Sequence, residues 1–194
     1  MTLENLMRDT CYWQRLLRLG GYEPGKIDGI RGPKTRQAEE RWHKDADAVL
    51  AAYGRYDARS EGVLMTLLPA AQRVARLWLS LAVPAGKSSG VDVRLICGTR
   101  SYAEQDVLYR KRPRVTNARA GQSMHNFGLA FDFGLFREGD YLEKSAQYNV
   151  LGRLSKQIPN VTWGGDWKKL VDTPHIKLDL FGETAAVRRV FESD

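Results

Sequence analysis

The chain has 194 residues, of which 43% are hydrophobic and 27% are charged. This composition excludes a disordered chain, and the length allows one domain, or a small module joined to a domain that buries a real core. The net charge of +7 favours an anionic partner without choosing one.

The opening residues show no charged start followed by an apolar run, so we expect no signal peptide and synthesis in the cytoplasm. The most apolar long segment, residues 64–83, is interrupted at helical spacing by Gln72, Arg73 and Arg76. It therefore predicts an amphipathic or buried helix, and we expect no membrane insertion.

The apolar pattern of the first residues predicts a helix that ends at the glycine pair 20–21. Residues 22–33 are rich in turn formers, and Pro33 suits the first position of a second helix, expected to run to about Trp42. The positions of the first helix at near-helical spacing are Leu6, Trp13, Leu16 and Leu17.

Residues 1–55 resemble the small helical peptidoglycan-binding domain of cell-wall hydrolases. The resemblance implies that bacterial peptidoglycan is a partner. His43, beside charged residues and without a partner histidine, is expected at the surface. The residues that carry the resemblance are Gln14, Leu17, Gly21, Tyr22, Gly25, Ile27, Asp28, Gly29, Gly32, Thr35, Ala38 and Trp42.

Glycine, serine and charged residues then predict a linker at residues 56–63, between the helical module and a second domain over residues 64–194. In that domain the helix over 64–83 leads to a predicted loop over 84–90 and a strand over 91–97. After Gly98 a helix is expected to start at Ser101 or Tyr102, with Glu104 helping to cap it.

Basic residues gather just before the central motif, where seven lysines or arginines stand against two acids over residues 94–119. Nucleic acid, an anionic wall polymer, an anionic substrate group and a solvated surface all stay open, although we find no nucleic-acid-binding motif and expect no nucleic acid partner. The basic residues are Arg94, Arg100, Arg110, Lys111, Arg112, Arg114 and Arg119.

Residues 123–132 place a histidine and an aspartate around a turn. After the turn at 126–128, residues 129–133 alternate as a strand, which puts Ala130 and Asp132 on one face. His125 can fold back towards Asp132. From these residues alone, two explanations are equally good. Either His125 and Asp132 are ligands of one metal ion, or His125 caps a turn and Asp132 accepts backbone hydrogen bonds.

A second histidine, His175, follows Asp172 near the end of the chain. Pro174 forces its predecessor to be extended, and we expect a bend that aims Asp172 and His175 into one cavity. The residues after His175, from Ile176 to Leu180, alternate as a strand. Two histidines and one carboxylate are a catalytic zinc set with a position left for water, and a nearby carboxylate can move that water's proton.

Three motifs together resemble the zinc peptidases that cut D-alanyl-D-alanine or L-alanyl-D-glutamate bonds in peptidoglycan stem peptides. The similarity runs over about residues 64–180. The motifs are Ser123-x-His125-x-x-Gly128-x-Ala130-x-Asp132, Trp163-Gly-Gly-Asp-Trp167 and Asp172-x-x-His175.

This resemblance implies an α+β domain whose small antiparallel sheet carries one zinc ion. It implies that Asp172 is the general base, where many relatives carry Glu, and that Arg100 and Gln105 contact the substrate or the developing oxyanion. Ser123 either contacts substrate or holds the turn, and Trp167 is expected to bind substrate. The implied zinc ligands are His125, Asp132 and His175.

The tryptophan-flanked loop, and the lack of a long helical insertion, favour the endopeptidase branch that cuts between L-alanine and D-glutamate. The order of module and peptidase is similar to modular endolysins of phages that infect Gram-negative bacteria. We therefore expect a monomer, made in the host cytoplasm, that acts on the periplasmic cell wall after release. A D-alanyl-D-alanine carboxypeptidase and a non-catalytic wall-binding module with a structural metal stay open as alternatives.

The two cysteines, Cys11 and Cys97, lie far apart and outside any Cys-x-x-Cys pair. Two reduced thiols are favoured, and the sequence does not exclude a disulfide.

Overall fold

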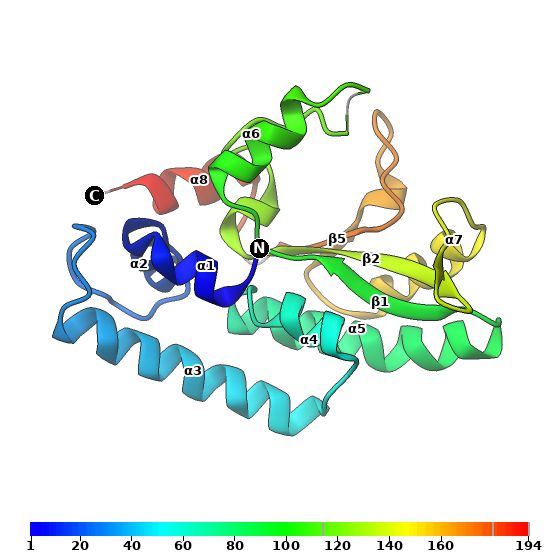
Figure 1. The fold of residues 1–194 in the computed structure, drawn as a ribbon, viewed down its shortest axis with the longest axis horizontal. Coiled ribbons are helices and arrows are strands. Elements are labelled where there is room, and N and C mark those ends of the chain that lie inside the picture. The colour runs from blue at the N-terminus through cyan, green and yellow to red at the C-terminus, as the bar shows by residue number, and fades with distance from the viewer. Residues whose placement is uncertain (114, 180, 194) are drawn as a thin grey trace.

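The computed structural model describes residues 1–113, 115–179 and 181–193 (Figure 1). The α-helices are α1 (Leu3–Arg8), α2 (Thr10–Leu19), α3 (Pro33–Tyr53), α4 (Ala58–Leu64), α5 (Pro69–Ser88), α6 (Tyr102–Arg110), α7 (Gln147–Gly152) and α8 (Thr184–Glu192). The 3₁₀ helices are η1 (Met124–Phe127), η2 (Arg153–Gln157) and η3 (Gly164–Asp166). The strands are β1 (Asp92–Cys97), β2 (Ala130–Arg137), β3 (Asp140–Tyr141), β4 (Val161–Trp163) and β5 (His175–Leu178).

The strands form one small antiparallel sheet in the order β1-β2-β5-β4, and the short β3 pairs with β2. This confirms the predicted α+β class. The predicted strand over 91–97 is β1, and the helix predicted after Gly98 is α6, where the Ser101 hydroxyl and the Glu104 carboxylate cap each other's backbone N–H. The predicted last strand is β5, which ends at Leu178, and Leu180 lies outside the described residues.

The central strand β2 separates the hydrophobic core from a polar face. Phe131 and Phe133 are buried against Trp78 of α5, with ring centroids 5.9 and 4.6 Å away. Asp132 stands between them in sequence, so its side chain points to the opposite face of the sheet. The view in Figure 1 shows α5 running along one side of the sheet while α6 lies on the other. The predicted alternation is therefore present, and it leaves one face of β2 for function.

The first predicted helix is two helices, because Asp9 starts a new one. Its carboxylate accepts a hydrogen bond from the N–H of Tyr12 at 3.0 Å, which caps α2. The buried Gln14 then ties the turn-rich segment to the helices: its amide oxygen accepts from the N–H of Asp28 at 3.1 Å, and its amide nitrogen donates to the Thr35 hydroxyl at 3.2 Å. The residues that carried the first resemblance thus hold this helical region together.

Helix α3 is longer than predicted. Its buried positions continue past Trp42 through Ala46 and Val49, and it ends only at Gly54, where φ is +77°. Glycine occupies that backbone region without the steric cost of a Cβ atom.

Residues 56–63, predicted as a linker, contain most of α4. Asp57 caps this helix, and Glu61 forms a 2.7 Å ion pair with Arg76 of α5, whose side chain is fully buried. A single hydrophobic cluster includes Trp13 of α2 and Phe133 of β2. The division into residues 1–55 and 64–194 stays a prediction, but the two parts share one core.

The prediction of a loop over residues 84–90 is wrong, since α5 continues through Pro84 to Ser88. Packing of the end of α5 against β1 outweighs the preference of the Pro-Ala-Gly-Lys-Ser-Ser segment for a loop. A Cβ atom on Gly86 would lie 2.5 Å from the Val93 side chain, so the glycine lets the end of α5 approach β1 closely. Within the described ranges, no helix has both the length and the apolar character needed to cross a membrane.

Candidate metal centre

The predicted ligands come from two regions that are far apart in sequence: η1 with the adjacent strand β2, and the later strand β5. His125 lies on η1, which ends at Gly128 in the left-handed region with φ of +66°. The chain then turns directly into β2, which carries Asp132, and the pairing of β2 with β5 sets Asp132 opposite His175.

The three predicted ligand atoms form a nearly equilateral triangle. His125 Nε2 lies 3.1 Å from Asp132 Oδ1, His175 Nδ1 lies 3.0 Å from the same oxygen, and the two nitrogens are 3.1 Å apart. Zinc bound tetrahedrally by nitrogen and oxygen at about 2.0–2.2 Å would hold its donors about 3.3–3.6 Å apart. The donor set therefore fits a zinc ion with adjustments of a few tenths of an ångström.

The hydrogen bonding of His125 presents the correct nitrogen to this triangle. Its Nδ1 lies 2.6 Å from the carbonyl oxygen of Gly98. A carbonyl only accepts, so Nδ1 carries the hydrogen and Nε2 keeps a free lone pair. Burial lowers the pKa of His125 to about 4, so the imidazole is neutral at pH 7, as a ligand must be.

Asp132 supplies the negative charge of the set. Burial alone would raise the pKa of this carboxyl, but the adjacent His125 and His175 hold the pKa well below its usual range. Arg100 faces the other carboxylate oxygen, with Nη2 3.5 Å from Oδ2. Two imidazoles and one carboxylate are a ligand set used by catalytic zinc sites.

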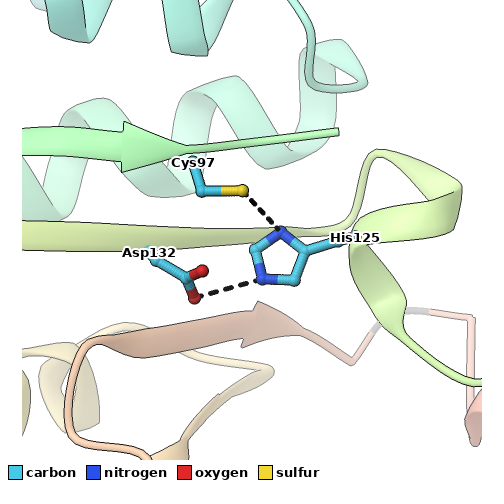
Figure 2. Close-up of side chains that lie close together, drawn as sticks. All are labelled: Cys97, His125 and Asp132. Atoms are coloured by element: carbon cyan, nitrogen blue, oxygen red, sulfur yellow. Dashed lines mark hydrogen bonds and ion pairs between the residues drawn. The ribbon is translucent and has the colours of Figure 1, made fainter. Parts of the chain in front are cut away.

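Cys97 also lies close to His125 and Asp132, but against the other side of the imidazole (Figure 2). Its Sγ is 4.0 Å from His125 Nδ1, the nitrogen that donates to Gly98, whereas Asp132 approaches Nε2. One ion therefore cannot use the Asp132 side of the ring and Cys97 together. Burial, then the charge of Asp132, raises the pKa of the Cys97 thiol to about 12, so it stays protonated behind the ligand set. Cys11 is likewise a free thiol and is exposed.

Asp172 is held beside the ligands by a β-turn. Its carbonyl oxygen accepts a hydrogen bond from the N–H of His175 at 3.2 Å, with Pro174 inside the turn. The predicted bend is therefore present, although it does not break the ladder, since the Pro174 carbonyl accepts from the N–H of Phe133 at 3.1 Å. Burial, then the charge of Asp132, raises the pKa of Asp172 above its usual value.

Gly164 lies against the β-turn at a distance that only a residue without a side chain allows. The N–H of Asp172 donates to the Gly164 carbonyl at 3.0 Å. A Cβ atom on Gly164 would lie 2.4 Å from the Asp172 carbonyl oxygen and 3.1 Å from the Cβ of His175. The glycine-opened loop therefore lets two chain segments approach closely at the site.

The candidate site opens into a cleft of about 260 Å³. A larger hollow of about 790 Å³ lies between α3, α5 and residues 158–160 and is lined mainly by apolar side chains. We place the candidate site in the smaller cleft because its side chains can bind a metal ion, although its volume is smaller. The predicted residues that line the smaller cleft are Arg100, Ser123, His125, Trp167, Asp172 and His175.

The predicted substrate-binding residues occupy different positions. Trp167 lines the cleft and packs against His175, with ring centroids 5.0 Å apart. Ser123 lines the cleft too, and its hydroxyl accepts from the N–H of His125 at 3.4 Å, so both of its expected roles stay possible. Gln105 is fully buried and, among the described residues, is not one that lines the cleft. It holds Arg100 instead, accepting from Nη1 at 3.2 Å.

The basic cluster does not converge on the cleft. Arg94 pairs with Asp92, Arg110 with Asp106, and Arg119 lies over the ring of Tyr109. Arg114 lies outside the described residues. Among the described members of the cluster, Arg100 is the one that lines the cleft.

Sequence reasoning missed other cleft residues, including Thr116, Asn117, Lys177 and Thr184. The alternation of the last strand contained a signal for Lys177, because it lies two residues after His175 and so shares its face. The loop residues 116 and 117 carried no periodic signal.

Residues 116–178 match a family model described as D-alanyl-D-alanine carboxypeptidase. The matched range contains all three predicted ligands and Asp172. Residues 116–178 are therefore similar to that peptidase family.

Two peptidoglycan endopeptidases are also similar to this chain. The chain is 37% identical over 109 residues to the peptidoglycan L-alanyl-D-glutamate endopeptidase CwlK of Bacillus subtilis, a match that covers 48% of this chain and 65% of that protein. The chain thus spans just under two thirds of that relative's length. The crystal structure of the Serratia marcescens L-Ala D-Glu endopeptidase ChiX is similar, with a TM-score of 0.50 and 28% identity, and the match covers 66% of this chain and 92% of that one.

Proposed function

We propose that this chain is a zinc-dependent peptidase that hydrolyses the L-alanyl-D-glutamate bond of peptidoglycan stem peptides. The observation that carries the proposal is the triangle of donor atoms from His125, Asp132 and His175. The two histidines of this triangle line one cleft with Asp172 and Arg100. The two named relatives, each described as acting on this bond, support the choice of substrate.

The residues of the candidate site have separate roles in the proposed reaction. His125, Asp132 and His175 would hold the zinc ion, which when bound polarises a carbonyl and acidifies water. Asp172 would accept the proton of the attacking water and return it to the leaving amine, and its raised pKa suits a group that must do both. Arg100 offers a fixed positive charge to a stem-peptide carboxylate or to the developing oxyanion.

Mass spectrometry of muropeptides after digestion of purified peptidoglycan tests this function, with and without a chelator. Cleavage between L-alanine and D-glutamate that stops with the chelator and returns with zinc supports the proposal. Activity that persists in the chelator argues against a metal-dependent reaction.

The description of the matching family model favours one alternative, a D-alanyl-D-alanine carboxypeptidase on the same scaffold. The same spectra separate the two reactions, because the carboxypeptidase removes only the terminal D-alanine. A non-catalytic wall-binding module with a structural metal would bind peptidoglycan and release no new amino groups.

We also propose that the protein is a monomeric phage endolysin that reaches the periplasmic wall after release from the host cytoplasm, with residues 1–55 binding peptidoglycan. This proposal rests on the resemblance of the helical region and on the order of the two parts. Purified protein should lyse Gram-negative cells whose outer membrane has been permeabilised and leave intact cells unchanged. Equal lysis of both, or of neither, would count against it.

A further inference from the structure

Tyr12 of α2 lies 88 residues before Arg100 in sequence, yet its hydroxyl sits against the backbone of the candidate site. It donates to the carbonyl oxygen of Arg100 at 3.1 Å and also lies within hydrogen-bonding reach of the carbonyl oxygen of Asn126. The first of these residues lines the cleft, and the second directly follows the predicted ligand His125. Helix α2 thus contacts both segments from behind.

The contacted backbone is the point where the two segments join. The N–H of Arg100 donates to the carbonyl of His125 at 3.0 Å, and the side-chain amide of Asn126 donates to the carbonyl of Arg100 at 2.9 Å. The Asn126 side-chain oxygen accepts from the N–H of Gly121 at 3.0 Å. Tyr12 adds a donor to this junction, where an unpaired buried carbonyl would be costly.

The Tyr12 hydroxyl stays protonated and can act as a hydrogen-bond donor at this junction. The side chain is buried, and burial raises its pKa well above the usual value, so the proton stays on the oxygen and is shared between the two carbonyls. The ring packs edge-on against Phe191 of α8, with centroids 5.1 Å apart, and against Tyr102 of α6 at 6.0 Å. This packing keeps the hydroxyl aimed at the junction.

We propose that Tyr12 is a positioning residue of the catalytic centre, acting through the backbone that carries Arg100 and His125. The helical region at the start of the chain then has a second role, as part of the scaffold that sets the geometry of the site. The kinetic part of the test rests on the proposed function, but the metal-binding part does not.

The test compares Tyr12→Phe with the matched control Tyr102→Phe in the full chain. Both tyrosines belong to the same aromatic cluster and each loses one hydrogen-bonded hydroxyl, but that of Tyr102 donates to Glu192 at 2.9 Å and not to the site. Three quantities are measured: kcat and KM on soluble muropeptides, zinc affinity by competition with a chromophoric chelator, and Tm.

We expect Tyr12→Phe to lower kcat/KM about tenfold, as for the loss of one buried hydrogen bond, and to weaken zinc binding severalfold. Tyr102→Phe should keep wild-type kcat/KM and zinc affinity, and its fall in Tm measures the general cost of losing a hydroxyl from this aromatic cluster. Wild-type values for Tyr12→Phe, or equal losses in the two variants, would overturn the proposal. If the wild-type protein cleaves no muropeptide, the proposed function fails, and the difference in zinc affinity between the variants still decides the role of Tyr12.

Discussion

At Asp172 the chain places a shorter side chain where many relatives of the resembled family carry glutamate. The structure shows how the carboxylate comes to the cleft: the β-turn that ends at His175 and the close approach of Gly164 bring the backbone itself inward. In the proposed mechanism this backbone placement would make up for the shorter side chain.

The substitution Asp172→Ala should leave zinc binding intact, because Asp172 is outside the donor triangle, and should lower kcat by roughly 10²–10⁴, the range for loss of a general acid–base. Steady-state kinetics together with metal analysis of the purified variant measure both effects. Asp166→Ala is the matched control, since Asp166 belongs to the same loop but pairs with Lys156 at the exposed surface. Full activity of Asp172→Ala would remove Asp172 from the mechanism.

Among the elements, the loop that contains η3 is as important to the site as the strands. Gly164→Ala introduces a Cβ atom 2.4 Å from the Asp172 carbonyl oxygen, so the β-turn must move. We expect at least a tenfold loss of kcat/KM, since small displacements of catalytic groups are costly. Gly62→Ala is the control, because a Cβ atom there meets nothing within 4 Å and alanine favours the helix. A Gly164→Ala variant with unchanged kinetics would show that the turn tolerates displacement.

The ion pair between Glu61 of α4 and Arg76 of α5 predicts that the stability of the fold depends on pH. Burial alone would raise the pKa of Glu61, but the hydrogen bonds from Arg76 and from the Tyr56 N–H, with the charge of Arg76, outweigh burial and lower this pKa. The stabilisation is therefore fully present above the ordinary pKa of 4.5 and is lost as pH falls through the lower, folded-state value.

Glu61→Gln should accordingly lower the free energy of unfolding at pH 7 by roughly 3 kcal/mol, since it leaves a buried guanidinium without its charged partner. The difference from wild type should shrink as the pH drops below 4.5. Denaturant unfolding at several pH values measures it. Glu4→Gln, in the exposed pair with Arg8, should cost less than about 1 kcal/mol at any pH. A pH-independent loss in Glu61→Gln would mean that packing, and not charge, is responsible.

For the whole molecule, the donor triangle predicts that metal removal lowers stability. The ligands come from η1, β2 and β5, so an ion bound by all three would link these segments in the folded state alone. At a zinc concentration about 1,000 times its Kd, binding stabilises the folded state by roughly 4 kcal/mol. Thermal unfolding with a chelator, and again after zinc is restored, should show a reversible fall in Tm. His175→Ala should abolish the zinc-dependent part, and an unchanged Tm in the chelator would speak against the site.

The sequence by itself predicted several of the local elements and proposed the ligand set. Periodic apolar spacing predicted β1 and the alternation of β2, cap chemistry predicted α6, and the motifs predicted His125, Asp132, Asp172 and His175 as one group. These signals are short-range, so they can be read without knowing what packs against them.

Only the tertiary structure decided the features that depend on distant partners. The glycine-rich end of α5 is helical because Gly86 lies against β1, and Gln105 faces Arg100 and not the cleft because the chain folds over it. The contact of Tyr12 with the backbone behind His125 joins two parts that the sequence separates. Such contacts arise from side chains brought together across long stretches of chain, and no local pattern of residues encodes them.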